Sequence, residues 1–235
     1  MTQNTQQLIR SRNSSRWIHR LARWISPPAP LVMNPAEPRD FPLGRWNLYL
    51  GGAGARVPGY VNVDLVAHPG VDTVADVKIL PFPTGLFTRV ECDAVLEHVR
   101  DPEAAMREIE RVLQPGGFAH VVTPFCHPLH RYPEDYRRFN IPALQAMSGS
   151  LELVAAGWRT GPTATLLAVV IEYVKLLFPG NAWRAAAHLA VGWLTFPLRY
   201  LDLILLRRPE AACLGNHCYV WLRKPEAGRP SPTSR

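Results

Sequence analysis

A chain of 235 residues is long enough for one well-buried α/β domain with appendages, and we expect one such domain rather than two. Its apolar content of 47% excludes bulk disorder, and its formal charge of +7 favours anionic partners without choosing among nucleic acid, anionic lipid and acidic substrates. The four cysteines form no CxxC pair and no zinc-like spacing, even though Cys126, His127 and His130 lie close together in sequence. We therefore expect free thiols, a reducing cytoplasmic location and no metal centre.

The first 40 residues predict an appendage rather than part of a core. Trp17 and Trp24 recur at helical spacing with apolar neighbours, opposite three arginines, which predicts a short basic amphipathic helix. That composition is typical of a helix lying in a membrane interface, and a flexible tail solvated by its arginines fits it equally well. Five prolines between Pro27 and Pro38 then predict a stiff linker. Because no uninterrupted apolar stretch follows the basic residues, we expect no secretory signal.

Strand and helix signals alternate from residue 47 onward. Asp101 followed by Pro102 predicts a helix start, because aspartate is a good N-cap and proline suits the first turn. A further helix is expected after Asn140. Strands are expected at residues 47–50, 60–65, 71–75, 89–92, 118–123, 151–156 and 217–223. Strands that alternate with helices favour an α/β fold with a mainly parallel sheet.

An apolar segment precedes the last of these strands and predicts two helices separated at residues 179–181. The second, residues 185–206, is long enough to cross a bilayer. Arg199 and Asp202 oppose this at about 2.5–3.5 kcal/mol each, against about 0.3–0.6 kcal/mol returned per leucine or isoleucine. A hairpin that lies in the interface or covers the active site is therefore favoured over a true span, with a dimer interface as the alternative.

The expected organisation follows from these elements. It comprises a basic appendage and linker (1–40), a core (41–162), an apolar helical insertion (163–209), the final core strand (210–224) and a disordered tail (225–235).

A glycine-rich turn, residues 51–54, directly follows the first expected strand. Such a turn lets the backbone come close to a ligand, and Asp64 at the end of the second strand can accept hydrogen bonds from both ribose hydroxyls of an adenosine. Only ten residues, Gly51 to Tyr60, separate the two strands, so the first helix is a turn at most and a poor pyrophosphate cradle. This counts against a dinucleotide and favours a cofactor without phosphates. A purely structural turn is the alternative.

Residues 48–65 resemble the first motif of class I S-adenosylmethionine-dependent methyltransferases, closest to a small-molecule or glycan branch with a Pro-Gly turn before an Asn-Val-Asp strand. Asp76 and Val77 resemble the second motif, where the acid contacts the adenine amino group. Residues 94–99 resemble the segment beside the sulfonium, and residues 111–117 resemble the turn before the fifth strand. The four motifs follow in order within residues 46–158, and the resemblance extends to the final strand.

The resemblance implies a Rossmann-like α/β sheet, mostly parallel with an antiparallel last strand and a helical insertion before it. It also implies S-adenosyl-L-methionine as the cofactor. Ala53 stands where the family usually has a second glycine and Tyr49 where many members have an acid, so a degenerate, non-catalytic member is the alternative. The candidate cofactor-binding residues are Gly51, Gly52, Ala53, Asp64, Leu65, Asp76, Val77 and Cys92.

The acceptor side is expected above the ends of the fourth and fifth strands. A hydroxyl acceptor must lose a proton, and His98, His127 and His130 are the candidate bases, with a packed helix-start residue as the alternative for His98. Residues 130–139 resemble a segment of the same methyltransferase branch that is dense in polar and aromatic groups. Its candidate substrate-binding residues, as an acceptor wall or lid, are Tyr132, Asp135, Tyr136 and Arg138. A structural pair between Asp135 and a nearby arginine is the alternative.

These features predict a methyltransferase that acts on a hydroxyl of a glycan, lipid-linked or other small-molecule acceptor near the membrane. The alternative is a non-catalytic protein of the same fold that serves as a membrane-associated interaction module. Expected partners are the acceptor, an anionic membrane surface at the inner face of the cytoplasmic membrane and a second copy of the chain. Nucleic acid is disfavoured, because the tryptophans of the basic tail lie with its apolar stripe.

Overall fold

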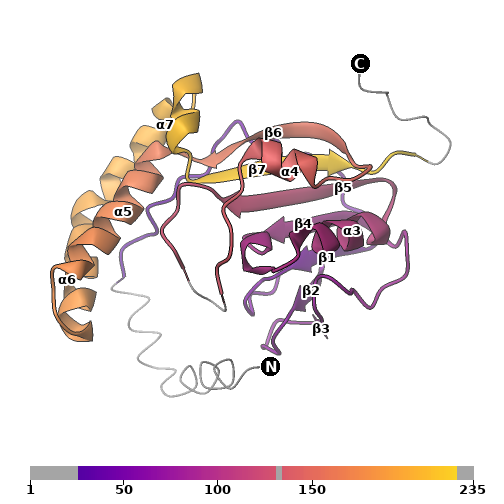
Figure 1. Ribbon diagram of the computed structural model, residues 1–235, viewed down its shortest axis with the longest axis horizontal. Coiled ribbons are helices and arrows are strands. Elements are labelled where there is room, and N and C mark those ends of the chain that lie inside the picture. The colour runs from indigo at the N-terminus through magenta and orange to yellow at the C-terminus, as the bar shows by residue number, and fades with distance from the viewer. Residues whose placement is uncertain (1–25, 131–133, 227–235) are drawn as a thin grey trace.

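The computed structural model describes residues 26–130 and 134–226, which form a seven-stranded sheet with helices on one face and a helical hairpin at one end (Figure 1). The strand order is β3-β2-β1-β4-β5-β7-β6. The first five strands pair in parallel, and β7 runs antiparallel to both β5 and β6. The strands are β1 (Asn47–Leu50), β2 (Val61–Asp64), β3 (Thr73–Val74), β4 (Phe87–Asp93), β5 (Leu113–Pro124), β6 (Glu152–Thr160) and β7 (His217–Arg223). The predicted fold class is confirmed.

Several strands differ in length from the prediction. Strand β5 was expected to begin at residue 118, after a turn at the Pro-Gly-Gly sequence. It begins at Leu113 instead and includes that sequence, because Leu113 pairs with Phe87 of β4. Strand β6 extends to Thr160, four residues past its predicted end, because its pairing with β7 continues to His217. Pairing partners distant in sequence therefore set the strand ends.

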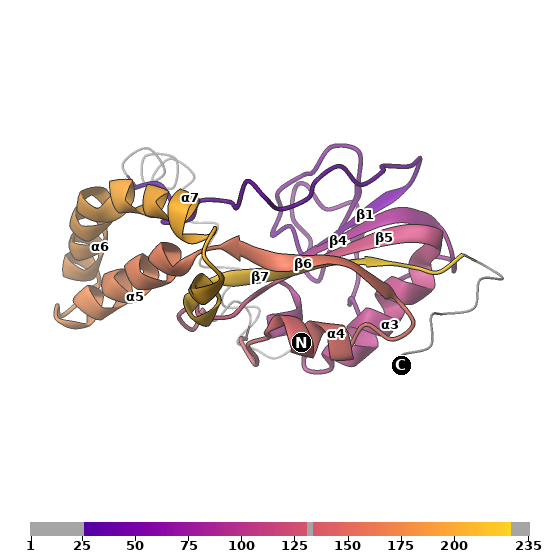
Figure 2. The same cartoon turned by 90° about the horizontal axis from the view of Figure 1, so that it is seen from above.

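Two helices and one short turn cover one face of the sheet (Figure 2). Helix α3 (Pro102–Val112) is capped by Asp101, which accepts a hydrogen bond from the amide of Ala104 at 3.0 Å. Helix α4 (Ile141–Ala146) is capped in the same way by Asn140. The 3₁₀ turn η1 (Leu96–His98) follows β4. Both predicted helix starts are confirmed, and the apolar side of α3 packs into the main core.

The N-terminal segment, from residue 26 to the start of β1, is extended and crosses the opposite face of the sheet (Figure 2). The ring of Phe41 stacks on Trp221 of β7 at a centroid distance of 4.0 Å. The amide of Asn34 donates to the carbonyl of Arg159 in β6 at 2.8 Å. This segment contains the proline-rich linker, and its contacts show that residues predicted to be an appendage cover part of the sheet. The predicted amphipathic helix before it lies outside the described residues.

The segment between β6 and β7 is helical and projects from the sheet as a hairpin (Figure 1). Asp202, fully buried, accepts hydrogen bonds from the first amides of α5, those of Thr163 and Ala164, at 2.8 and 3.0 Å. Pro197 lies in a 3₁₀ stretch, so residues 185–206 do not form the single helix that was expected. The elements are α5 (Pro162–Leu176), α6 (Asn181–Thr195), η2 (Phe196–Leu201), α7 (Asp202–Leu205) and η3 (Pro209–Leu214).

None of the helices in the described part of the chain combines the length and the apolar character that a membrane crossing requires. The division of the chain into a core and an insertion stays a prediction, although the helices between β6 and β7 occupy the place where the insertion was expected.

Candidate active site

The predicted site residues gather at one edge of the sheet because the parallel strands end there. Strands β1, β2, β4 and β5 end at Leu50, Asp64, Asp93 and Pro124. The antiparallel strand β7 begins at the same edge, since His217 pairs with both Pro124 and Thr160. The glycine-rich turn, η1, the loop after β5 and the start of β7 are therefore neighbours, as is usual for ligand sites in open α/β sheets.

The glycine-rich turn after β1 lies against η1 and the end of β2. Gly51 has φ +75°, and a Cβ there would lie 2.3 Å from Cγ2 of Val95, so this position excludes a side chain. The amide of Ala53 donates to Oδ2 of Asp64 at 2.9 Å. All residues between 51 and 60 are described and none is helical. The turn therefore suits a ligand approached by backbone and does not offer a helix N-terminus for phosphates.

Ala53 adopts a backbone conformation that favours glycine, with φ +48°. A Cβ in this left-handed region crowds the following carbonyl and costs about 1–2 kcal/mol. The departure from the family motif noted in the sequence therefore has a structural consequence: the turn keeps its shape with a strained alanine.

The other predicted cofactor residues differ in how they face the site. Asp76 accepts from the amide of Lys78 at 3.0 Å, and its side chain is 43% exposed, so the carboxylate is accessible. Leu65 is half-exposed beyond β2, and Val77 packs partly against the core. Cys92 is only 1% exposed and lies inside the hydrophobic core. Its side chain is therefore not available to a cofactor, and only its backbone borders the site.

The three predicted catalytic histidines lie together. The ring centroids of His98 and His130 are 5.0 Å apart, and those of His127 and His130 are 5.3 Å apart. A fourth histidine, His217, lies 5.2 Å from His127. His217 was not among the predicted site residues, because nothing in its local sequence indicates that β7 starts at this edge.

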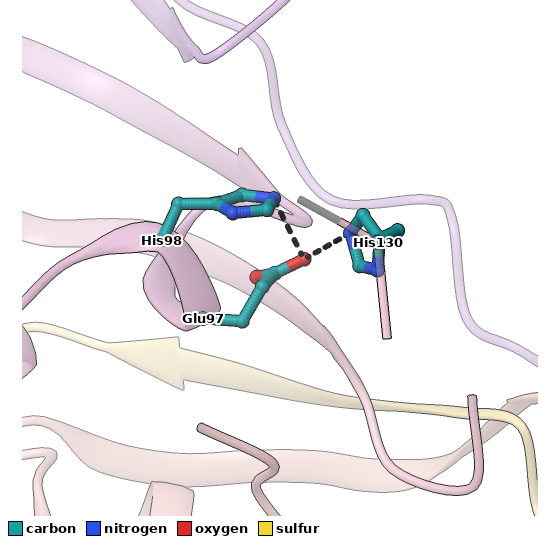
Figure 3. Close-up of side chains that lie close together, drawn as sticks. All are labelled: Glu97, His98 and His130. Atoms are coloured by element: carbon teal, nitrogen blue, oxygen red, sulfur yellow. Dashed lines mark ion pairs between the residues drawn. The ribbon is translucent and has the colours of Figure 1, made fainter. Parts of the chain in front are cut away.

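A buried carboxylate, that of Glu97 in η1, lies between two of these rings. Figure 3 shows His98 and His130 turned toward it from η1 and from the loop after β5. Its Oε1 is 3.7 Å from Nε2 of His98 and 3.6 Å from Nε2 of His130. The side chain is fully buried, and neither carboxylate oxygen has a hydrogen-bond partner among the described residues. Glu97 was not among the predicted site residues, although it lies inside the motif at residues 94–99.

Burial sets the protonation of this group of side chains. It raises the pKa of Glu97 to about 7, since few partners offset the loss of water around the carboxylate. It lowers the pKa of His127 and of His130, and that of His217 to about 3. These three histidines are therefore neutral at pH 7, which leaves a lone pair on each ring, and the lowered pKa makes each a weaker base than a free histidine.

The loop after β5 is held by Asp135 and Arg138. Arg138 donates to Oδ2 of Asp135 at 2.7 Å and to the carbonyls of His127 and Pro128, each at 3.2 Å. Oδ2 of Asp135 also accepts from the amide of His130 at 3.0 Å. The hydrogen bonds from Arg138 lower the pKa of Asp135 to about 2. This pairing supports the structural alternative for both residues, which position the histidine loop.

Two further predicted substrate residues lie in the same loop. The hydroxyl of Tyr136 accepts from Nε of Arg100 at 3.0 Å, and the side chain is half-exposed. Tyr132 lies outside the described residues.

Among the described residues, one set of side chains has the composition of a metal site. Ligand atoms of Glu97, His98 and His130 all lie within 4.8 Å of one another. No metal centre was expected from the spacing of the cysteines and histidines, because that spacing does not include Glu97.

Residues 61–121 match a family model described as a methyltransferase domain. Two curated relatives are demethylmenaquinone methyltransferases. That of Renibacterium salmoninarum is 29% identical over 158 residues, which cover 64% of this chain and 60% of the relative. That of Streptomyces griseus is 30% identical over 135 residues, which cover 54% of this chain and 57% of the relative. The chain therefore spans less than two thirds of the length of these relatives.

Two solved structures share the fold. The [4+2]-cyclase SpnF is 20% identical, with 91% of this chain and 85% of that chain covered and a TM-score of 0.52. A phosphoethanolamine N-methyltransferase of Haemonchus contortus, solved with S-adenosylhomocysteine, is 18% identical, with 81% and 51% covered and a TM-score of 0.52. Together with the sheet order, these likenesses show that the chain has the fold of class I methyltransferases, with residues 61–121 similar to a methyltransferase domain.

Proposed function

We propose that this chain transfers a methyl group from S-adenosylmethionine to a hydroxyl of a small acceptor that reaches the site from a membrane surface. The observation that carries the proposal is the contact between the glycine-rich turn and the segment after β4, at the edge where the parallel strands end. There Gly51 contacts Val95, and Val95 is followed two residues later by the glutamate that faces two histidines. The cofactor turn and the candidate acceptor side are therefore joined through a single short segment.

The residues present fit the cofactor of the family. S-adenosylmethionine supplies a methyl group already activated on a sulfonium. Asp64 uses its two oxygens to accept from the amides of Ala53 and Val66, and a carboxylate has about four lone-pair sites, so capacity for ribose hydroxyls is left. Asp76 follows the neighbouring strand, and the amide of Ala75 donates to the carbonyl of Asp64 at 3.0 Å. The two predicted acids, Asp64 and Asp76, therefore lie at the ends of neighbouring strands on the same edge of the sheet.

On the acceptor side, the chain supplies neutral imidazoles where a hydroxyl would lose its proton. Asn216 fixes the ring of His127, whose Nδ1 lies 3.2 Å from Oδ1 of that residue. Alignment of acceptor and methyl group supplies most of the acceleration in such a transfer, and a positioned base adds about 10²–10⁴-fold. The named demethylmenaquinone relatives favour a small, quinone-like acceptor over a glycan.

The helical hairpin supports a membrane-borne acceptor because it starts at the edge that carries the site. Thr165 of α5 donates to the carbonyls of Cys126 and Leu214, at 3.0 and 2.8 Å, and so ties the hairpin to the histidine loop. Its outer surface exposes large apolar side chains, with Leu176 at 74% and Leu194 at 80%. Exposed basic side chains accompany them, namely Arg184, Arg207 and Arg208. This combination is typical of surfaces that rest in an anionic membrane interface.

The competing function is a membrane-associated interaction module that has kept the fold without transferring methyl groups. The left-handed Ala53 in the cofactor turn is the observation that favours it. Calorimetry with S-adenosylhomocysteine separates the two functions. The transferase requires micromolar binding that Asp64→Ala weakens at least tenfold, while Asp40→Ala, at an exposed linker aspartate, leaves it unchanged. Absence of binding to the wild-type chain would establish the module instead.

The acceptor and the membrane are tested separately. Incubating the chain with labelled cofactor and a membrane extract should yield a labelled product in the lipid fraction, and a product confined to the aqueous fraction would contradict a membrane-borne acceptor. The chain should float with anionic vesicles, and Leu176→Glu with Leu194→Glu should abolish flotation, whereas Leu43→Glu, at an exposed leucine before β1, should not. A stable dimer in sedimentation without flotation would assign the apolar surface to a second copy of the chain.

A further inference from the structure

The Glu97 carboxylate has no hydrogen-bond partner among the described residues and yet lies fully buried between two imidazoles (Figure 3). An unpaired buried carboxylate is costly, because it has lost water and gained nothing in exchange. Both imidazole nitrogens are beyond hydrogen-bond distance, at 3.6 and 3.7 Å from Oε1. The three groups therefore face a common point without bonding to one another.

The far side of each imidazole faces an acceptor. Nδ1 of His98 hydrogen bonds to the carbonyl of Glu134, and Nδ1 of His130 lies 3.3 Å from Oδ2 of Asp135 without forming a hydrogen bond. A carbonyl only accepts, so Nδ1 of His98 carries the hydrogen, and the carboxylate beside Nδ1 of His130 favours the same tautomer. In a neutral ring the Nε2 lone pair then points to Glu97. This arrangement, with a carboxylate or a carbonyl behind the ring, is the one that orients histidine ligands of metals.

The distances suit ligands gathered around one ion. Metal bonds to imidazole nitrogen and carboxylate oxygen are about 2.0–2.2 Å long, so two ligand atoms of a tetrahedral site lie about 3.4 Å apart. The observed separations of 3.6 and 3.7 Å need only small side-chain rotations to reach this geometry. We propose that Glu97, His98 and His130 bind a divalent first-row transition metal ion, such as Zn²⁺.

A site of two histidines and one carboxylate leaves coordination positions open. His130 is the most exposed of the three ligands, with 38% of its side chain accessible, so the open coordination positions are reached from solvent on the side of His130. An acceptor with a hydroxyl beside a second oxygen would occupy them through both oxygens, which would position it and favour loss of the hydroxyl proton. With two histidines assigned to the ion, His127 is left as the proton acceptor. This acceptor role rests on the proposed function, whereas the ion site does not.

The test is binding of the metal alone to full-length protein that has been stripped with a chelator and then freed of it. Calorimetry with Zn²⁺ should show one ion bound per chain, and Co²⁺ should give the visible spectrum of nitrogen and oxygen ligands. Glu97→Gln and His130→Ala should each weaken binding at least tenfold. His188→Ala, at a histidine of α6, is the matched control and should bind as the wild type does.

Either of two results would overturn the ion site: no binding by the wild-type chain, or binding that Glu97→Gln and His130→Ala leave intact. A thiolate charge-transfer band with Co²⁺ would do so as well, by assigning the ion to cysteines. Circular dichroism shows whether each variant is folded, and His130→Ala, in a partly exposed loop, keeps the test valid if Glu97→Gln unfolds. Failure of the ion site with intact cofactor binding and transfer would leave the proposed function standing. Metal binding without methyl transfer would support the ion site and contradict the proposed function.

Discussion

Two clusters of buried carboxylates and histidines lie in this molecule, and they differ in whether their charges are paired. The first, here called the strap cluster, lies where the N-terminal segment crosses the sheet. His120 of β5 lies 2.9 Å from Oε1 of Glu37 and 2.7 Å from Oε2 of Glu91. Arg89 donates to Glu91 at 2.6 Å, and Arg159 approaches Glu37 at 3.7 Å. Glu91 therefore has both a histidine and an arginine partner at hydrogen-bond distance, and Glu37 has the histidine at that distance with Arg159 beyond it.

The second, the edge cluster, consists of Glu97, His98 and His130. Its carboxylate has neither an arginine nor a hydrogen bond among the described residues. The pKa values differ accordingly. Burial raises the pKa of Glu97. Burial alone would lower the pKa of His120, but the hydrogen bonds that its ring donates to Glu37 and Glu91 outweigh that effect and raise it. Removing one member of a buried charge pair is costly because it strands the other, while an unpaired buried carboxylate at the end of parallel strands indicates a binding site.

The largest effect on folding is expected when the strap cluster loses its histidine. His120→Ala leaves Glu37 and Glu91 buried with one partner fewer, and removal of one member of a buried charge network costs about 3–5 kcal/mol. Urea denaturation should show this loss in the free energy of unfolding, with His188→Ala as the control. A loss below about 1 kcal/mol would mean that the strap cluster is not held by charge pairing.

The edge cluster should respond in the opposite way. Glu97→Gln removes an uncompensated buried charge, so we expect a free energy of unfolding equal to or above that of the wild type. Methyl transfer to the product identified in the membrane extract should fall about 100-fold, equivalent to about 2.7 kcal/mol of barrier. Denaturation and initial rates should be measured on the same samples. A variant as destabilised as His120→Ala would erase the contrast between the two clusters.

His217, which lies beside His127 at the same edge of the sheet, makes the free energy of unfolding depend on pH. Burial lowers its pKa to about 3 in the folded protein, while the unfolded chain has the ordinary value of about 6.5. Unfolding therefore takes up a proton below pH 6.5, and stability falls as the pH drops through the window from 6.5 to 3. Between pH 7 and pH 5 this contributes a loss of about 2 kcal/mol.

His217→Asn, which does not titrate, should lose correspondingly less stability over the same interval. Thermal melts of the wild type and the variant at both pH values measure the difference. Parallel losses in the two proteins would show that other groups govern the acid response.

The smallest effect concerns the strained turn beside the edge cluster. Ala53→Gly relieves a left-handed alanine and should raise the free energy of unfolding by about 1 kcal/mol, together with the affinity for S-adenosylhomocysteine. Ala182→Gly, in the exposed first turn of α6, is the matched control and should lower stability by up to about 1 kcal/mol. If both substitutions destabilise the protein equally, the conformation of Ala53 carries no strain.

The sequence alone determined the features that depend on neighbouring residues. Asp101 and Asn140 predicted two helix starts because a cap acts on amides three residues away. The glycine-rich turn and Asp64 indicated the cofactor side because both lie at the ends of adjacent parallel strands. The short interval between the first two strands predicted a first helix of about one turn, since ten residues cannot hold a full crossover helix, and the structure has no helix there.

Only the tertiary structure decided which charges are paired. Asp202 counted in the sequence as an obstacle to a membrane span, and in the fold it caps α5 from nearly 40 residues away. Glu97 is unremarkable in sequence and becomes a candidate ligand only when the loop after β5 brings His130 against it. His217 reaches the same edge because β7 runs antiparallel. Periodicity and motifs report local preference, whereas burial and pairing depend on contacts between distant segments, which the packed sheet alone fixes.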